Sequence, residues 1–361
     1  MKIGIIAGAR PNFMKIAPII EAIREAAAKG VDISYRLIHT GQHYDKKMSG
    51  DFFEQLGIPE PDVNLEAGGG TQAEQTAAIM IGFEKELMAN PVDLVLVVGD
   101  VTSTMACSIV AKKLNIKVAH VEAGIRSFDL TMPEEINRMV TDSITDYFFT
   151  TSGIANQNLR KAGMEDGRIF FVGNTMIDTL LKNMPRFIEP PIWREANLKK
   201  GEYFVITLHR PANVDEEAKL TDLLKEIIGN AGHLPVIFPV HPRTAKILDG
   251  MGLKAENLFP IEPLSYLEFN YLVKFAKAVV TDSGGITEET TVMGVPCMTL
   301  RNNTERPETC TVGTNKLIGT DPGNIGPAFK KLFAGEWQHG GIPELWDGKA
   351  AKRIIDVLSN M

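Results

Sequence analysis

The sequence predicts an α/β protein built from two doubly wound domains of similar size. Short, nearly continuous apolar runs alternate with amphipathic helical patterns, which is typical of parallel strands with helices on both faces of the sheet. This alternation starts at the N-terminus and restarts after Val172. A chain of 361 residues is long enough for two to three domains at about 150 residues each. We therefore expect domains at residues 1–172 and 173–347.

The first half begins with a buried strand, residues 3–7, directly before a helical pattern. Apolar side chains recur at helical spacing from Phe13 to Ala27. Further strands are predicted at 34–39, 94–98, 118–121 and 147–150, and helices at 71–88 and 103–114. This order is that of repeated strand–helix units.

The second half repeats the rhythm after a proline-rich surface connection at residues 185–191. Strands are predicted at 203–208, 236–240, 258–261, 278–281 and 296–300, and helices at 216–228, 266–275 and 285–293. Ligands of open α/β sheets bind beyond the carboxyl ends of the strands. If two such domains face each other, we expect the site in the cleft between them.

Composition excludes several classes of protein. The formal net charge is −7, whereas general nucleic-acid and anionic-membrane binders are basic. No apolar run approaches the roughly 20 residues that a membrane helix needs. The three cysteines, Cys107, Cys297 and Cys310, match no zinc or redox spacing, which favours reduced thiols in a cytoplasmic protein. We expect neither a nucleic-acid nor a membrane partner.

The first strand-to-helix turn, residues 7–12, favours an anionic ligand but not a dinucleotide. It has one glycine where the dinucleotide fingerprint needs three, so NAD binding loses its support. Arg10 and Lys15 lie near the helix start, where cations and backbone N–H groups together suit an anion. Two solvated surface charges are the alternative interpretation.

Residues 281–289, Thr-Asp-Ser-Gly-Gly-Ile-Thr-Glu-Glu, give the strongest phosphate signal. Small residues where a strand passes into a helix let backbone N–H groups approach a phosphate, and the helix dipole favours its charge. Ser283, Gly284 and Gly285 are the expected ligands, and Glu289 lies one turn further, where it can accept ribose hydroxyls. An ordinary strand-to-helix turn is the alternative.

Three acidic residues are candidates for acid–base chemistry. Asp100 and Glu122 each follow a predicted strand directly, and Glu134 opens a helix with Arg138 four residues later. The alternatives are a helix cap for Asp100, a salt bridge for Glu122, and for Glu134 a helix-dipole residue paired with Arg138.

His209 and His241 also stand at predicted strand ends, where imidazole can donate to a phosphate or transfer a proton. The histidines have no metal-ligand spacing with the cysteines, and the sequence has neither His-Glu-x-x-His nor Gly-x-Ser-x-Gly. We expect neither metal catalysis nor a serine hydrolase.

Taken together, the motifs resemble those of the non-hydrolysing UDP-N-acetylglucosamine 2-epimerases nearly end to end. In chain order they are Gly8-Ala9-Arg10-Pro11, Thr40-Gly41-Gln42-His43, Gly99-Asp100, His120-Val121-Glu122-Ala123-Gly124-Ile125-Arg126, Pro133-Glu134-Glu135-Ile136-Asn137-Arg138, Gly173-Asn174-Thr175, Pro239-Val240-His241, Asp282-Ser283-Gly284-Gly285 and Thr304-Glu305-Arg306-Pro307-Glu308. The resemblance implies a GT-B-like pair of Rossmann-like domains, an interdomain active site and a homodimer. It also implies that a C-terminal helix within residues 348–361 packs back on the first domain.

The family reaction interconverts UDP-GlcNAc and UDP-ManNAc without NAD or metal. A base removes the C2 proton while UDP leaves C1, and UDP then re-adds to the enzyme-bound 2-acetamidoglucal as C2 receives a proton from the other face. The resemblance makes Asp100, Glu122 and Glu134 the acid–base candidates, without saying which removes the proton. The resemblance also implies that His209 and Arg10, with Lys15 nearby, stabilise UDP as it leaves. Ser283, Gly284 and Gly285 would bind the diphosphate and Glu289 the ribose. Arg306 would reach the UDP or sugar side, Phe269 would lie near uracil, and Arg138 would brace Glu134 and the substrate.

In bacterial relatives a second UDP-GlcNAc binds beside the substrate as an activator. Gln42 and His43 match part of that site, and Arg210 and His241 are candidates to line it. Residues 66–71 and 209–213 depart from the bacterial pattern, so the sequence leaves activation open.

Four other functions compete with this interpretation. The same chemistry can act on a modified sugar such as UDP-2,3-diacetamido-glucuronate, although residues 305–308 favour plain UDP-GlcNAc. A GT-B glycosyltransferase would have no use for the three carboxylates. A hydrolysing epimerase would release free ManNAc and UDP, and a nucleotide-sugar sensor would lack the acid–base set.

Overall fold

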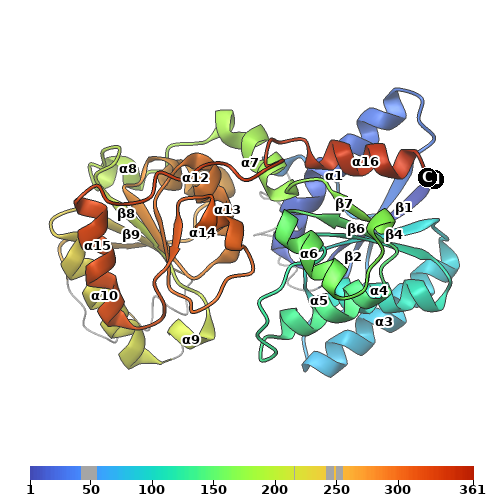
Figure 1. Cartoon of the computed structure of the whole chain (residues 1–361), viewed down its shortest axis with the longest axis horizontal. Coiled ribbons are helices and arrows are strands. Elements are labelled where there is room, and N and C mark those ends of the chain that lie inside the picture. The colour runs from blue at the N-terminus through green and yellow to red at the C-terminus, as the bar shows by residue number, and fades with distance from the viewer. Residues whose placement is uncertain (42–54, 215, 241–247, 249–254) are drawn as a thin grey trace. The chain divides into compact units, whose positions relative to one another are not determined.

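The chain folds into two compact units, Met1–Lys182 with Glu344–Met361, and Asn183–Pro343. The computed structural model describes residues 1–41, 55–214, 216–240, 248 and 255–361, without the side chains of Arg10, Pro211 and Ala212. Figure 1 shows helices flanking a central sheet in each unit, so the predicted fold class is confirmed. The predicted interdomain position of the active site stays a prediction.

The first unit is organised around a parallel sheet. Its described strands are β1 (Lys2–Ala7), β2 (Ser34–His39), β3 (Val63–Asn64), β4 (Leu94–Val98), β5 (Lys117–Val121), β6 (Tyr147–Thr150) and β7 (Ile169–Phe171). They are ordered β3-β2-β1-β4-β5-β6-β7, and neighbours pair in parallel. The strand order reverses between β1 and β4, and open α/β sheets bind ligands in a crevice at the carboxyl ends of the strands at such a point.

Helices cover this sheet on both faces. Those described are α1 (Arg10–Ala28), α3 (Gln72–Ala89), α4 (Thr102–Lys113), α5 (Pro133–Ile144), α6 (Gly153–Lys161), α7 (Thr175–Asn183) and α16 (Ala350–Ser359), with a 3₁₀ turn at Asp166–Arg168. Ile79 and Phe83 of α3 pack with Val95 and Val97 of β4 in one buried cluster. Burial of these apolar side chains stabilises the layer by about 25 cal/mol per Å² of apolar surface.

The second unit repeats the design. Its described strands are β8 (Phe204–Thr207), β9 (Val236–Pro239), β10 (Leu258–Ile261), β11 (Ala278–Thr281), β12 (Cys297–Thr299) and β13 (Asn315–Leu317). They are ordered β10-β9-β8-β11-β12-β13, again in parallel. Here the order reverses between β8 and β11, so the crevice lies at the ends of these two strands.

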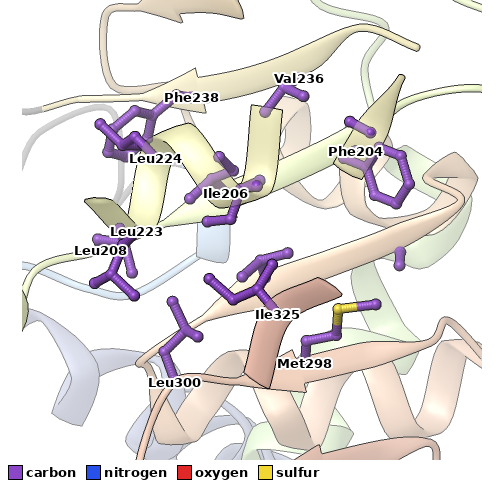
Figure 2. Packing of buried hydrophobic residues seen from close by; sticks show 14 of the residues in the cluster. Phe204, Ile206, Leu208, Leu223, Leu224, Val236, Phe238, Met298, Leu300 and Ile325 are labelled. Atoms are coloured by element: carbon purple, nitrogen blue, oxygen red, sulfur yellow. The ribbon is translucent and has the colours of Figure 1, made fainter. Parts of the chain in front are cut away.

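Both faces of the second sheet are buried, as its continuous apolar strands predict. The described helices are α8 (Ile192–Glu195), α9 (Pro211–Val214), α10 (Glu217–Ala231), α12 (Tyr266–Phe275), α13 (Gly284–Met293), α14 (Pro307–Thr311) and α15 (Ile325–Phe333), with 3₁₀ turns at Met184–Arg186 and Pro322–Asn324. Figure 2 shows Phe204 and Ile206 of β8 in one cluster with Leu223 of α10 and Ile325 of α15. The alternate residue Val205 packs in a second cluster with Leu272 of α12.

The first unit extends ten residues beyond the boundary expected at 172. The reason is that α7 forms hydrogen bonds with other helices of the first unit. Thr179 Oγ1 donates to the Met14 carbonyl of α1 over 2.6 Å. Asp178 accepts from the first N–H groups of α16, those of Ala350 (3.1 Å) and Ala351 (2.7 Å). Helix α16 in turn packs against α1 (Figure 1).

Several predicted elements have the bounds of the sequence pattern, among them β4, β6, β11 and α12. The pattern missed β3, β7 and β13, which are two or three residues long. Runs this short carry no periodicity to detect. Within the described residues, no helix is both long and apolar enough to cross a membrane.

Candidate active site

Asn12 lies where the strand order of the first sheet reverses, between the ends of β1 and β4. Its Oδ1 accepts the N–H groups of Gly8 (3.0 Å) and Ala9 (2.9 Å), and its Nδ2 donates to the Val98 carbonyl over 3.1 Å. The side chain therefore joins the turn after β1 to the end of β4. A Cβ on Gly8 would come within 2.2 Å of Ser103 Oγ, so this turn has room only for glycine.

Glu122 follows β5 and forms a buried ion pair with Lys15 of α1. Lys15 Nζ lies 2.8 Å from Glu122 Oε2, and the two side chains are 12% and 2% exposed. Glu122 has φ +70°, a left-handed conformation that is uncommon for a non-glycine residue. Such strain is typical of functional sites, because the surrounding structure must hold it in place.

Asp100 follows β4 and is held by two residues of α5. Its Oδ2 accepts from Arg138 Nε over 3.0 Å and lies 2.9 Å from Arg138 Nη2. Its carbonyl accepts from Asn137 Nδ2 over 2.8 Å. The Asp100 side chain is 33% exposed, so a ligand can reach this oriented carboxylate.

The bracing partners of Arg138 differ from our expectation. We expected Arg138 to brace Glu134, but the structure gives it two other partners, Asp100 and the buried Glu135. Glu135 also accepts from Ser127 N (2.9 Å) and Phe128 N (3.1 Å), whereas Glu134 is exposed in the first turn of α5. The physical reason is that α5 turns Glu135, not Glu134, toward the protein interior.

A second buried network lies on the same helix. Asp142 Oδ1 is 2.7 Å from His120 Nδ1, and its Oδ2 pairs with Arg126 Nη1 over 2.7 Å. Burial alone would raise the pKa of Asp142, but the hydrogen bond and charge of His120 and the charge of Arg126 lower it overall. Because Glu135 and Asp142 are seven residues apart, they share one face of α5.

In the second unit, Asp282 organises the crevice between β8 and β11. Its Oδ1 is 2.7 Å from His209 Nδ1, and its carboxylate accepts the N–H of His209 (3.1 and 3.2 Å) and of Arg210 (2.9 Å). Burial alone would raise the pKa of Asp282, but the hydrogen bond and charge of His209, with the other donors, lower it. The His209 side chain is 62% exposed, so its ring can meet a ligand.

The predicted phosphate loop is the start of α13. Ser283 is the residue before the helix and donates its N–H to Thr281 Oγ1 over 2.9 Å, while Gly284 and Gly285 are the first helical residues. An ideal Cβ on Gly284 would lie 3.9 Å from both Arg301 Nη1 and Glu305 Oε2. The first N–H groups of the helix and the helix dipole suit an anion. The nearby guanidinium of Arg301 is itself paired with the Glu305 carboxylate over 2.8 Å.

Glu289 lies deep in the same helix. It is 4% exposed and accepts from the Tyr266 hydroxyl over 2.9 Å. Burial raises the pKa of Glu289 to about 7, although the Tyr266 hydroxyl and the Asn270 amide act in the opposite direction. Its protonation therefore changes near neutral pH.

The remaining predicted residues of the second unit lie near this helix or on its neighbour. Arg306 is buried and its Nε pairs with Glu288 of α13. Phe269 of α12 is partly buried and packs against the hydrophobic cluster that contains Val205 of β8 and Leu272 of α12. Arg210 donates through Nε to the Asp282 carbonyl over 3.1 Å.

Some predicted residues cannot be placed. Gln42, His43 and His241 lie outside the described residues, and for Arg10 the structure describes the backbone at the start of α1 but not the side chain. In the described part of the chain, no cluster of His, Cys, Asp or Glu side chains could hold a metal ion.

Sequence reasoning missed several residues that support these clusters: Asn12, Glu135, Asn137, Asp142 and Arg301. For α5 a signal was present. Glu135, Arg138 and Asp142 recur at i, i+3 and i+7, which places three charged side chains on one face of the helix. Charges in that pattern, following a strand end, indicate a polar helix face that packs inward.

Comparisons with known proteins show the family to which the chain belongs. The family model described as UDP-N-acetylglucosamine 2-epimerase matches residues 25–359. The UDP-N-acetylglucosamine 2-epimerase of Methanocaldococcus jannaschii is 41% identical over 99% of both chains. The UDP-2,3-diacetamido-2,3-dideoxy-D-glucuronate 2-epimerase of Pseudomonas aeruginosa is 38% identical over 100% of both.

Among solved structures, the UDP-GlcNAc 2-epimerase of M. jannaschii in complex with UDP-GlcNAc and UDP superposes with a TM-score of 0.89, at 41% identity and over 100% of both chains. The similarity thus extends over the whole length in both sequence and fold. The chain belongs to the UDP-N-acetylglucosamine 2-epimerase family.

Proposed function

We propose that the chain reversibly epimerises UDP-N-acetylglucosamine to UDP-N-acetylmannosamine at C2. The observation that carries this proposal is the pair of carboxylates, Asp100 and Glu122, at the ends of the adjacent strands β4 and β5, next to the β1–β4 position where the strand order reverses. Each has a cationic partner, Arg138 for Asp100 and Lys15 for Glu122. The named activities of full-length relatives support the same reaction.

The chemistry is elimination followed by re-addition. One carboxylate takes the proton from C2 as the C1–O bond breaks, so the electron pair of C2–H forms the C1–C2 double bond of 2-acetamidoglucal and UDP leaves with the bonding pair of C1–O. A second carboxylic acid returns a proton to the opposite face of C2 while UDP re-adds to C1. Asp100, Glu122 and Glu134 are the proposed acid–base residues.

Departure of UDP requires donors for the growing negative charge of the diphosphate. We assign this role to His209, because Asp282 occupies its Nδ1 and the exposed ring can offer Nε2. Arg10 and Lys15 add positive charge from the first unit. Ser283, Gly284 and Gly285 would bind the diphosphate, with Arg306 on the UDP or sugar side.

The nucleoside would also be bound by the second unit. Glu289 would accept the ribose hydroxyls, and Phe269 would lie near uracil. Arg138 would orient Asp100. One sugar nucleotide would then engage the residues of both units at once.

A modified UDP-sugar is the second candidate substrate. The 38% identical relative named for UDP-2,3-diacetamido-2,3-dideoxy-D-glucuronate favours it. The 41% identical relative named for UDP-N-acetylglucosamine, together with Glu305-Arg306-Pro307-Glu308, favours the plain sugar.

The cellular setting completes the proposal. The chain would act in the cytoplasm as a homodimer and supply ManNAc-type sugars for surface polysaccharide or glycan synthesis, with no cofactor. Gln42, His43, Arg210 and His241 are the candidate residues for binding an activating second UDP-GlcNAc.

The direct test is turnover in D2O followed by NMR. UDP-GlcNAc should gain deuterium at C2 in both epimers, because elimination breaks the C2–H bond and the returning proton comes from an acid that exchanges with solvent. Epimerisation with complete retention of the original hydrogen would refute the mechanism.

The same experiment separates the alternatives. Free ManNAc with UDP would indicate a hydrolysing enzyme, and exchange only with the diacetamido-glucuronate substrate would identify the modified sugar. If neither UDP-sugar gains deuterium at C2, the remaining candidates are a glycosyltransferase and a nucleotide-sugar sensor.

Amide variants test the carboxylates. Asp100→Asn, Glu122→Gln and Glu134→Gln should each lower kcat by about 10²-fold or more, the usual loss when a general acid or base is removed. UDP affinity, measured by calorimetry, should change little, because the proposed UDP contacts are largely in the second unit. Glu25→Gln, an exposed position on α1, is the matched control. Native rates in all three variants would show that these carboxylates are structural.

Glu289 should make UDP binding depend on pH. Its pKa of about 7 in the free protein means that the carboxyl group is mostly protonated below pH 7 and must ionise to accept two ribose hydroxyls. The dissociation constant of UDP should therefore rise roughly tenfold between pH 8 and pH 6, beyond the titration of UDP itself. The Glu289→Gln variant measures the pH dependence that comes from UDP itself, because glutamine cannot ionise. Identical pH dependence in both proteins would contradict the role of Glu289.

A further inference from the structure

The first unit contains a fully buried histidine behind the Gly99–Asp100 turn. His120 lies on β5 with its side chain 0% exposed. Its Nδ1 is 2.7 Å from Asp142 Oδ1, and its Nε2 is 2.8 Å from the Gly99 carbonyl oxygen. The ring cannot reach a substrate, so any effect on the reaction must act through its neighbours.

Both ring nitrogens face hydrogen-bond acceptors. A carbonyl oxygen can only accept, so Nε2 must carry a proton toward Gly99. Asp142 is surrounded by donors on its other oxygen, Gly124 N at 3.1 Å and Arg126 Nη1 at 2.7 Å. An ionised Asp142 has no proton to donate, so Nδ1 must supply the second one. With Asp142 ionised, the protonation state of His120 that satisfies both acceptors is an imidazolium paired with that carboxylate.

The His120 ring donates to the carbonyl of Gly99, a residue in the left-handed backbone conformation. Gly99 has φ +67°, and a Cβ there would lie 3.0 Å from Lys15 Nζ. Its N–H donates to the Val121 carbonyl over 3.0 Å, and its carbonyl accepts from His120. With both polar groups of Gly99 fixed, the direction in which the chain enters Asp100 is fixed as well.

We propose that His120 is a positioning residue for the C2 proton transfer, which as an imidazolium held by Asp142 fixes the Gly99 carbonyl and so aims the Asp100 carboxylate. The inference rests on the proposed function. It adds a buried charge pair, His120 and Asp142, to the residues on which proton transfer depends, and gives them a role without substrate contact.

Nitrogen-15 NMR of the full chain, with labelled histidine, tests the protonation state directly. At pH 7 both ring nitrogens of His120 should carry a proton, and its signals are assigned among the seven histidines by their loss in His120→Gln. In Asp142→Asn the ring should lose one proton, because the amide no longer balances its charge. A ring with a single proton in the unmodified protein would overturn the inference.

Kinetics test the positioning role. His120→Gln and Asp142→Asn should each lower kcat by roughly tenfold or more, as expected when a reacting group is misplaced. KM and the affinity for UDP should stay unchanged, because neither residue faces the substrate. The double variant should be no slower than the slower single variant, since the two residues act as one unit.

Thr141→Val is the matched control. Thr141 is a buried neighbour of Asp142 on α5, and within the described residues its hydroxyl has no hydrogen-bond partner. This variant should keep the native kcat. If His120→Gln does not fold, Asp142→Asn, which preserves the shape of its side chain, provides the same comparison.

The outcomes separate this inference from the proposed function. If the native protein epimerises its substrate and a folded His120→Gln or Asp142→Asn variant keeps native kcat, the positioning role is wrong and the function stands. If the native protein exchanges no C2 hydrogen, the proposed function fails and the positioning role falls with it. A selective loss of kcat with two protons on the native ring supports both.

Discussion

In each unit a buried aspartate must have its negative charge matched, and the crevice residues are arranged around that requirement. Asp142 and Asp282 are 1% and 0% exposed, and each lies 2.7 Å from Nδ1 of a histidine. An unpaired buried carboxylate is strongly destabilising. Backbone N–H groups therefore converge on each one, from Gly124 in the first unit and from Arg210 in the second. These contacts fix the loops beyond the central strands, where a ligand would bind.

The two histidines differ in exposure, and that difference divides their proposed roles. His120 is fully buried, so it can act only on the protein itself. His209 is 62% exposed, so its ring can donate to a leaving diphosphate. In the proposed reaction, proton transfer at C2 belongs to the carboxylates of the first unit. The negative charge that develops on UDP is stabilised mainly by the second unit, where the start of α13 and nearby cations favour an anion.

The sequence predicted the parallel α/β units because buried strands and amphipathic helices leave strong periodic signals. It also placed Asp100, Glu122 and His209 at strand ends, although their roles stay predictions. It predicted Glu134 as the partner of Arg138, whereas the structure pairs Arg138 with Glu135, because the choice between these neighbours in the first turn of α5 depends on how that helix packs. Nor could it find the Asn12–Val98 contact, which joins residues 86 positions apart. Such pairings arise only when distant strands meet in the sheet.

The most direct test of the central claim is positional isotope exchange during turnover. UDP-GlcNAc with oxygen-18 in the bond between C1 and the β-phosphate is incubated with the protein and followed by phosphorus NMR. If UDP leaves C1 and rotates before it re-adds, the label should move from the bridging position to non-bridging oxygens of the β-phosphate as the epimers interconvert. Epimerisation through many turnovers with the label still entirely in the bridge would contradict elimination to a UDP that is free to rotate.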